Sequence, residues 1–187
     1  MRAFLAIEIP KEVRALLVRV QEELRRAGAD VKWVEPENLH LSLKFLGELS
    51  EDAVEGLRER VAPELAAWPA LSLTYAGVGS FPERGVPRVL WAGATGEIDR
   101  LAALALALER AAETVGVPRE GRPFVAHLTL GRVKSARNVK RLQALMEPQR
   151  QVPLGSGLVR EVVLYRSTLT SEGPLYEGIA RFPLRSG

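Results

Sequence analysis

The two histidines of this chain both open the same short phrase, which reads His-Leu-Ser-Leu at His40 and His-Leu-Thr-Leu at His127. Histidine is the side chain whose ordinary pKa, about 6.5, lets it give or take a proton near neutral pH. In an extended strand alternate residues share a face, so each phrase puts an imidazole and a hydroxyl on one side and two leucines on the other. We therefore expect the leucines to be buried, while both histidines, Ser42 and Thr129 face a cleft.

Two imidazoles and two hydroxyls in one cleft suit phosphoester chemistry that needs no metal. One neutral imidazole takes the proton from an attacking water or hydroxyl, and the other, when protonated, gives a proton to the departing oxygen. The hydroxyls can donate to the phosphoryl oxygens, on which negative charge accumulates. The attacking and leaving oxygens lie roughly in line through phosphorus, so the histidines must approach from opposite sides. Two lobes that carry one phrase each would provide this arrangement.

Other kinds of site fit the sequence less well. The chain has no cysteine, and neither phrase has an acidic residue at the spacing of a metal ligand, so we predict no metal and no cofactor. The chain also lacks the Gly-x-x-x-x-Gly-Lys-Ser/Thr loop that cradles phosphates and the Gly-x-Ser-x-Gly elbow of acyl-transfer enzymes. A lone histidine on a strand is usually only a half-buried, hydrogen-bonded residue. The repeated phrase uses every histidine of the chain and favours function.

The composition is that of an ordinary globular protein of 187 residues, 47% of them hydrophobic and 26% charged. The longest apolar runs, residues 4–7 and 101–108, are far shorter than the ~20 residues that span a membrane, and no signal-peptide core follows Met1. We expect a cytoplasmic monomer. The net charge of +3 permits a polyanionic partner. Arginine supplies 21 of the 26 basic residues, which together with few Asn, Met and Cys predicts a thermophilic source.

The elements that must position the phrases fall into two similar halves. Each half is expected to contain a strand, an amphipathic helix and a histidine-bearing strand. Apolar residues at helical spacing predict helices over residues 13–24, 51–65, 98–108 and 139–146. Besides the two phrases, strands are predicted over residues 4–9, 71–78, 88–92, 158–166 and 176–182.

These elements predict an α+β protein that has two pseudo-symmetric lobes of mostly antiparallel sheet, with helices outside. The active-site cleft is expected between the lobes. No linker rich in Ser, Gly or Pro separates the halves, so residues 1–187 are expected to form a single two-lobed domain.

Together with their flanks, the phrases resemble those of the two-histidine phosphoesterases, in the branch of RNA 2′,3′-cyclic phosphodiesterases and 2′-5′ RNA ligases. The similarity covers nearly the whole chain, and the segments that carry it are residues 2–7, 31–39, 40–47, 124–132, 164–167 and 173–177. One difference is Ser42, because the first motif of the family usually has Thr there. Serine keeps the donor but loses the methyl group that restrains rotation, so we expect Ser42 to be less fixed in orientation than Thr129.

The resemblance implies a fold, a reaction and roles for the residues. It makes His127 the general base and His40 the general acid in hydrolysis of a terminal 2′,3′-cyclic phosphate, which leaves a 2′-phosphate. With a 5′-hydroxyl of RNA as the exchanged alcohol, the same site would form 2′-5′ linkages. Ser42 and Thr129 would hold the phosphate and Arg132 would add charge. The implied substrates are RNA ends that carry a 2′,3′-cyclic phosphate, such as tRNA fragments.

Strand alternation leaves the two basic candidates open. Arg132 has the opposite parity to the polar residues of the second phrase, so it reaches the phosphate only if the strand twists or bulges at Gly131. Otherwise it forms a surface ion pair. Lys44 has the parity of the polar residues of the first phrase, and it either lines the cleft and binds substrate or is a solvated lysine at the end of the strand.

Other functions and contacts also remain open. A non-catalytic RNA-binding module would bind in a salt-dependent way that is indifferent to both histidines. A cyclic phosphodiesterase could instead act on small nucleotides or on 2′-5′ oligonucleotides. Arg84 and Arg88 could track a phosphate backbone. The aromatic residues that could stack on a base, although core packing is the simpler expectation for each, are Phe45, Phe81, Phe124 and Tyr165.

Overall fold

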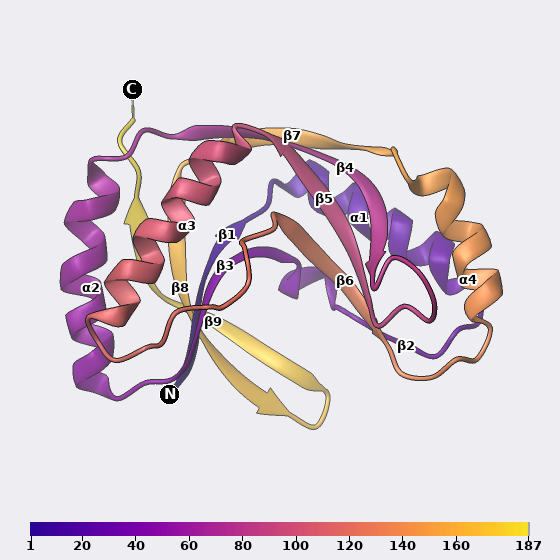
Figure 1. Ribbon diagram of the computed structural model, residues 1–187, viewed down its shortest axis with the longest axis horizontal. Helices are drawn as coiled ribbons and strands as arrows, with labels where there is room; N and C mark the ends of the chain where they lie inside the picture. The colour runs from indigo at the N-terminus through magenta and orange to yellow at the C-terminus, as the bar shows by residue number, and fades with distance from the viewer. Residues whose placement is uncertain (187) are drawn as a thin grey trace.

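The computed structural model describes residues 1–186 and contains two antiparallel sheets and four helices (Figure 1). The first sheet contains, in spatial order, β3 (His40–Glu48), β1 (Arg2–Glu8), β8 (Glu161–Thr170) and β9 (Gly173–Pro183). The second contains β2 (Val31–Trp33), β6 (His127–Val133), β5 (Val89–Gly96), β4 (Leu71–Phe81) and β7 (Pro153–Val159). The helices are α1 (Lys11–Arg25), α2 (Glu51–Ala66), α3 (Ile98–Glu113) and α4 (Val139–Met146). The predicted α+β class is confirmed.

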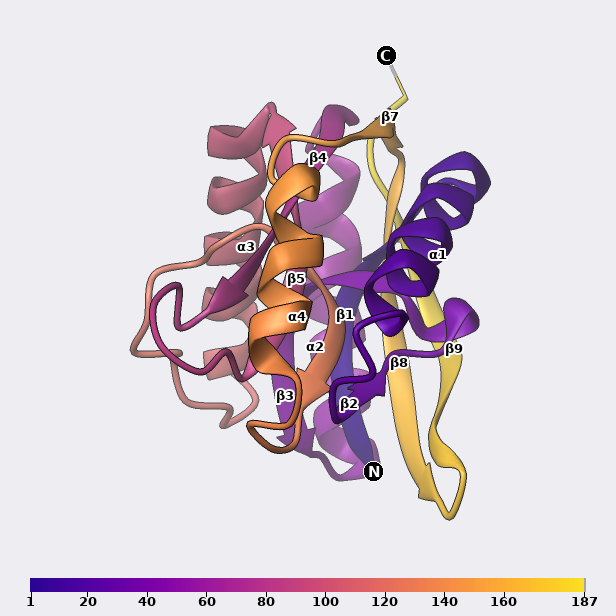
Figure 2. The same cartoon turned by 90° about the vertical axis from the view of Figure 1, so that its right-hand side faces the viewer.

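Two of the helices follow a strand of one sheet and pack beside a strand of the other. Although α1 follows β1 of the first sheet, it packs beside β7 and α4 of the second, and α3 follows β5 of the second sheet but packs against α2 and β3. Figures 1 and 2 show the result, with α2 and α3 together at one end of the molecule and α1 and α4 at the other. One hydrophobic cluster includes residues of both sheets, among them Leu5 and Leu128. The two lobes are therefore joined by a continuous core.

The local sequence explains where the elements begin. Helix α2 starts after Ser50, whose hydroxyl accepts a hydrogen bond from the amide of Ala53 at 3.1 Å. Its first turn carries Glu51 and Asp52, which stabilise the helix because their negative charges lie at the positive end of its dipole. The helix continues through Pro63 to Ala66. In the histidine strands, all four leucines of the two phrases are buried, as their alternation predicts.

Strand β7 is not among the predicted strands. Its sequence contains Gly155, which has a positive φ of 94°, and Gly157, where a Cβ would lie 2.6 Å from Cγ of Pro10. Glycine occupies these positions because other segments approach them closely. The β-branched residues that identify a strand in a sequence are therefore missing from β7. The strand predicted over residues 158–166 instead covers the end of β7 and the start of β8, which are separated by Arg160.

Candidate active site

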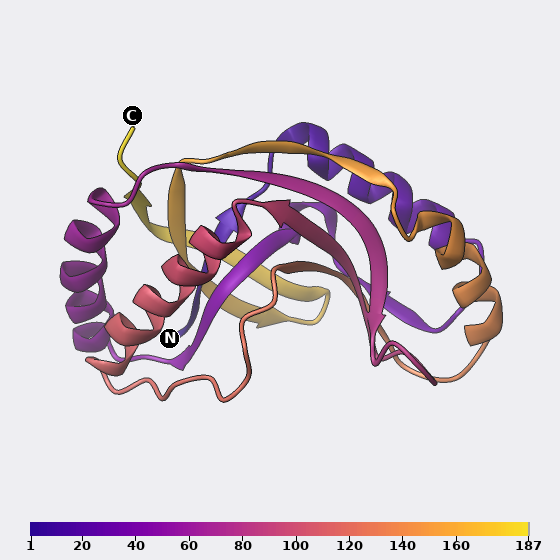
Figure 3. The same cartoon turned by 45° about the horizontal axis from the view of Figure 1, so that its top comes forward.

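The two histidine phrases lie where the two sheets meet. Strand β3 is an edge of the first sheet and β6 lies inside the second, and the two strands contact each other without pairing in one sheet (Figure 3). His40 is the first residue of β3, and His127 is the first residue of β6. The structure therefore brings the two phrases together from different sheets.

Both imidazoles are held in the same way by the backbone. Nδ1 of His40 lies 2.6 Å from the carbonyl oxygen of Asn38, and Nδ1 of His127 lies 2.7 Å from that of Val125. In each case the carbonyl belongs to the residue two positions earlier. Because a carbonyl oxygen can only accept, Nδ1 must be the protonated donor, and Nε2 is left to exchange a proton with a substrate.

His40 is enclosed by aromatic rings. Its ring centroid lies 4.9 Å from that of Phe4 and 5.4 Å from that of Tyr176, which meets it edge-on. Its Nε2 lies 2.8 Å from the hydroxyl of Ser42. Burial lowers the pKa of His40 below its ordinary value, and the hydrogen bond to the Asn38 carbonyl offsets this in part. The free protein therefore favours the neutral form of this imidazole.

His127 has a more open environment. The ring of Phe81 meets it edge-on at a centroid distance of 5.2 Å. Val125, whose carbonyl holds its Nδ1, is 54% exposed and lies in the segment between α3 and β6. Thr129 follows on the same face of the strand, with one buried leucine between the two residues. This half of the site is accessible where the half around His40 is packed.

A β-bulge decides where Arg132 points. Thr129 pairs with Trp91 and Gly131 pairs with Leu90, so Leu130 is an extra residue in β6. The extra residue reverses the alternation, and Arg132 rejoins the face of His127 and Thr129. The bulge on which the role of Arg132 depends is therefore present, one residue before Gly131.

Electrostatics agree with this placement of Arg132. Burial raises the pKa of Tyr176 on the opposite sheet, and the charges of Arg132 and Arg2 lower it in part. The Arg132 side chain is exposed, and within residues 1–186 it forms no ion pair. Its charge is thus available to a ligand that lies between the sheets.

The same kind of bulge turns Lys44 away from the cleft. In β3, Ser42 pairs with Ala6 and Lys44 pairs with Leu5, so Leu43 is the extra residue. The Lys44 ammonium is buried, donates to the carbonyl of Pro118 at 3.0 Å and pairs with Glu109 at 3.0 Å. The prediction that Lys44 binds substrate is wrong. It assumed regular alternation of side chains along β3, and the local sequence does not indicate the β-bulge that interrupts this alternation.

Phe45 takes the place expected for Lys44. It follows the bulge on the side of Phe4, with ring centroids 6.1 Å apart, and its side chain is 66% exposed. The expectation that Phe45 and Phe81 pack in the core is also wrong, since Phe81 is 38% exposed beside His127. Phe124 is partly buried against the core, and Tyr165 stacks on Phe4 at 5.2 Å.

Asn38 is a site residue that the sequence analysis missed. It is 7% exposed, and its side-chain amide donates to the carbonyl of Pro174 at 3.0 Å while its own carbonyl holds Nδ1 of His40. It thus connects the histidine to β9, which carries Tyr176. A buried polar residue two positions before a histidine is a signal that could have identified Asn38. Tyr176 has no such local signal, because it reaches His40 only through the fold.

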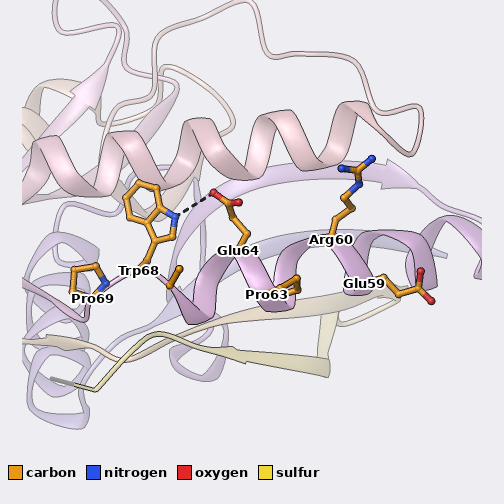
Figure 4. Close-up of a pocket in the computed structure, with 7 residues that line it drawn as sticks. Glu59, Arg60, Pro63, Glu64, Trp68 and Pro69 are labelled. Atoms are coloured by element: carbon orange, nitrogen blue, oxygen red, sulfur yellow. Dashed lines mark hydrogen bonds between the residues drawn. The ribbon is translucent and has the colours of Figure 1, made fainter.

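A cavity of ≈ 330 Å³ lies beside His40 and is lined by the side chains of Tyr165 and Tyr176, among others. A larger cavity of ≈ 500 Å³ lies along the end of α2, between Glu59 and Pro69, where the Trp68 indole donates to Glu64 (Figure 4). No histidine lines this second cavity. In the described part of the chain, no group of three or more His, Asp or Glu side chains could hold a metal ion, and no helix is long and apolar enough to cross a membrane.

Comparison with known proteins identifies the family. The model of the LigT-like phosphoesterases matches residues 7–91 and 94–176. The chain belongs to this family. Two relatives, each named RNA 2′,3′-cyclic phosphodiesterase, are 37% identical over 98% of this chain and 98% of the relative (Methanothermobacter thermautotrophicus) and 38% identical over 96% and 98% (Methanocaldococcus jannaschii). Relatives of this LigT-like phosphoesterase come from thermophiles, in line with the source predicted from composition.

Solved structures of LigT-like phosphoesterases share the fold. A crystal structure of a protein from Thermus thermophilus superposes with a TM-score of 0.84 at 32% identity and covers 100% of this chain and 99% of its own. The structure of E. coli LigT in complex with 3′-AMP gives a TM-score of 0.77 at 27% identity, with coverage of 98% and 97%. The two-sheet architecture is therefore that of the family.

Proposed function

We propose that this protein hydrolyses RNA 2′,3′-cyclic phosphodiester ends to 2′-phosphomonoesters by general acid and base catalysis with His40 and His127. The observation that carries the proposal is the matched fixing of the two imidazoles on strands that meet from different sheets. In each, Nδ1 is bound to the carbonyl two residues earlier, which leaves Nε2 as the nitrogen for proton transfer, and in the free protein Nε2 of His40 lies 2.8 Å from the Ser42 hydroxyl. The names of the relatives give the substrate class.

In this reaction, water attacks phosphorus while Nε2 of His127 accepts its proton. The bond from phosphorus to the 3′ oxygen breaks, and Nε2 of His40 gives that oxygen its proton. His127 ends protonated and His40 neutral, and exchange with solvent restores both. The hydroxyls of Ser42 and Thr129 and the guanidinium of Arg132 donate to the phosphoryl oxygens, on which charge develops.

The lowered pKa of His40 fits this role only once substrate is bound. An acid must carry a proton, and burial opposes the charged form in the free protein. The negative charge of a cyclic phosphate beside the ring favours the charged form, so substrate binding itself raises the pKa of His40. Rate against pH should follow a bell whose two limbs belong to the pair of imidazoles together.

The exposed aromatic residues can hold the terminal nucleoside. Phe45 lies next to the first phrase and Phe81 next to His127, and both rings offer surface on which a base can stack. With a 5′-hydroxyl of RNA in place of the attacking water, the same opening of the cyclic phosphate would give a 2′-5′ linkage at the same site. Our proposal includes action in the cytoplasm as a single-domain monomer, with tRNA fragments among the substrates.

The deciding experiment uses an oligonucleotide that ends in a 2′,3′-cyclic phosphate, incubated with the protein in excess chelator. We expect a 2′-phosphate end, formed at an undiminished rate in chelator. His40→Ala and His127→Ala should each lower kcat by about 100- to 10,000-fold. A 3′-phosphate product would contradict the proton roles. Activity within twofold of wild type in either variant would remove the proposed site.

The non-catalytic alternative is tested with the same variants. A binding module would retain its affinity for the oligonucleotide without either histidine and would leave the cyclic end intact. The observation against this alternative is the matched tautomer of His40 and His127, which RNA binding alone would not require.

A further inference from the structure

One stretch of the chain carries only positive charge. Between residues 121 and 146 there are six basic residues and no acidic residue, namely Arg122, Arg132, Lys134, Arg137, Lys140 and Arg141. Within residues 1–186, none of the six forms an ion pair. Of the 17 arginines elsewhere, seven form an ion pair within the same residues, as in the pairs of Arg100 with Glu97 and of Arg150 with Glu147. What sets this stretch apart is that six basic residues stand together without an acidic residue among them.

Strand pairing gathers several of these cations next to the active site. Lys32 of β2 pairs directly with Arg132 of β6, so the two side chains leave the sheet on the same face. Lys134 lies two residues beyond Arg132, and its amide donates to the carbonyl of Asp30 at 2.7 Å. Arg137 follows in the turn before α4. All four side chains are exposed. We call Lys32, Arg132, Lys134 and Arg137 the basic edge.

The basic edge continues the face that carries His127 and Thr129. The bulge at Leu130 places Arg132 on that face, and Lys134 follows directly after the end of β6. Figure 2 shows β2 beside the turn that leads from β6 into α4. Residues two apart on a strand are about 6.5 Å apart, which is comparable to the spacing of successive phosphates in an extended RNA strand.

The basic edge adds nothing evident to fold stability. The cations are exposed and unpaired, and the first turn of α4 carries Lys140 and no acidic residue, which the helix dipole disfavours. Helix α2 shows the opposite and stabilising arrangement, with Glu51 and Asp52 in its first turn. A row of like charges that lowers stability and leads into a phosphate site is best explained by a polyanionic ligand.

From these observations we infer that the basic edge binds the phosphodiester backbone of the nucleotides that precede the cyclic end, so that the substrate is an RNA strand and not a small cyclic nucleotide. This inference rests on the proposed function. Arg132 contacts the reacting phosphate, and Lys32, Lys134 and Arg137 contact successive phosphates upstream. The gain from substrate length should level off after about three further nucleotides, when the three cations are occupied.

The test compares the wild type with the triple variant Lys32→Gln, Lys134→Gln and Arg137→Gln. A matched control removes one exposed cation from each of α1, α2 and α3, in Lys11→Gln, Arg60→Gln and Arg110→Gln, and gives the same net charge. The substrates are a 2′,3′-cyclic mononucleotide and cyclic-ended oligonucleotides of two to eight nucleotides. Fluorescence anisotropy separately measures the binding of an octanucleotide that ends in a 2′-phosphate.

We expect the triple variant to raise KM for the octanucleotide by roughly 10- to 100-fold and to lower the salt slope of its binding by about 2, since each phosphate contact on a single strand contributes about 0.7. Its kcat/KM for the mononucleotide should stay within about twofold of wild type, and the control variant should resemble wild type on every substrate. Equal effects of the triple and control variants would overturn the basic edge.

Failure of the proposed function gives a different result. If wild type cleaves neither substrate, yet the octanucleotide still binds through the three cations, the proposed chemistry is wrong and the binding surface stands. If wild type cleaves both substrates with the same KM and the triple variant binds the octanucleotide normally, the chemistry stands and the basic edge is overturned.

Discussion

The two histidine phrases share a backbone frame and differ in what surrounds it. Both hold Nδ1 with the carbonyl two residues earlier, and both bulge at their fourth residue. In β3 the bulge turns Lys44 inward and Phe45 outward. In β6 the corresponding bulge turns Gly131 inward and Arg132 outward. The repeated frame therefore presents an aromatic ring on one side of the cleft and a cation on the other.

The surroundings of the two imidazoles differ as much as these outer residues. His40 lies against Phe4 and Tyr176 and is anchored through a buried Asn38, whereas the residue that holds His127 is an exposed Val125. The frame makes Nδ1 the protonated nitrogen in both rings, and the packing around His40 lowers the pKa of that ring. Under the proposed function, one local pattern serves two opposite proton-transfer roles.

The largest effect should come from Lys44, which the bulge places in the core. Lys44→Met leaves Glu109 without its partner and should lower the free energy of unfolding by about 3 kcal/mol, while kcat of the folded protein stays within twofold. Denaturant unfolding measures the loss. Adding Glu109→Gln should restore most of it. A variant of normal stability whose KM rises tenfold would place Lys44 in the cleft after all.

Arg132 and Phe45 occupy equivalent positions and should fail in different ways. Arg132→Gln removes the positive charge that stabilises the negatively charged phosphoryl oxygens, and it should lower kcat by about 100-fold. Phe45→Leu removes a stacking surface and should raise KM for the cyclic-ended oligonucleotide by roughly 5- to 100-fold with little change in kcat. Steady-state kinetics on both variants separate the two patterns. Identical changes in kcat would mean that the two sides of the cleft are not specialised.

Asn38 and Val125 provide a matched pair, since only the first uses its side chain. Asn38→Ala frees the Pro174 carbonyl and loosens the wall beside His40, and it should lower kcat by about tenfold. The nearly isosteric Asn38→Asp should be equally impaired, because a carboxylate cannot donate. Val125→Ala keeps its carbonyl and should retain wild-type kcat. A pH profile that shifts in the Asn38 variants, and not in Val125→Ala, would distinguish positioning from general loosening.

The smallest effect should appear in stability against pH. Burial lowers the pKa of His40 in the folded protein, so the unfolded chain binds this proton more readily. Its contribution to stability is then complete above about pH 6.5 and is lost as the pH falls through 6.5 toward the folded pKa. His40→Gln should flatten this part of the curve in denaturant titrations. An unchanged slope would mean that burial does not lower the pKa of His40.

The short phrases carried most of the site, and pairing geometry carried the rest. Alternation correctly predicted that the leucines are buried and that Ser42 lies beside His40, because these properties depend on two or three neighbouring residues. Alternation failed at Lys44 because an extra residue in β3, Leu43, reverses the side chains that follow it up to a second register shift after Phe45. A similar extra residue in β6, Leu130, returns Arg132 to the face of Thr129. A bulge depends on the partner strand, so the phrase alone could not reveal it.

The fold was predictable to a similar degree. The helices and the α+β class follow from apolar spacing, whereas β7 was missed because glycines fill it where Pro10 and neighbouring elements approach. The packing of α1 on the second sheet and the reach of Tyr176 to His40 depend on contacts between distant parts of the chain. No local pattern encodes such contacts.

The position of β1 between β3 and β8 has a consequence for how the protein folds. Ala3 pairs with Gly47 on one side and with Arg166 on the other. Strand β1, the first of the chain, therefore completes its pairing only when β8, near the end of the chain, is in place. Pairings so distant in sequence slow folding, because a long loop must close before the contact is gained. During synthesis, the wall of Tyr176 beside His40 forms only after β9 has left the ribosome. The half of the candidate active site around His40 is therefore completed last.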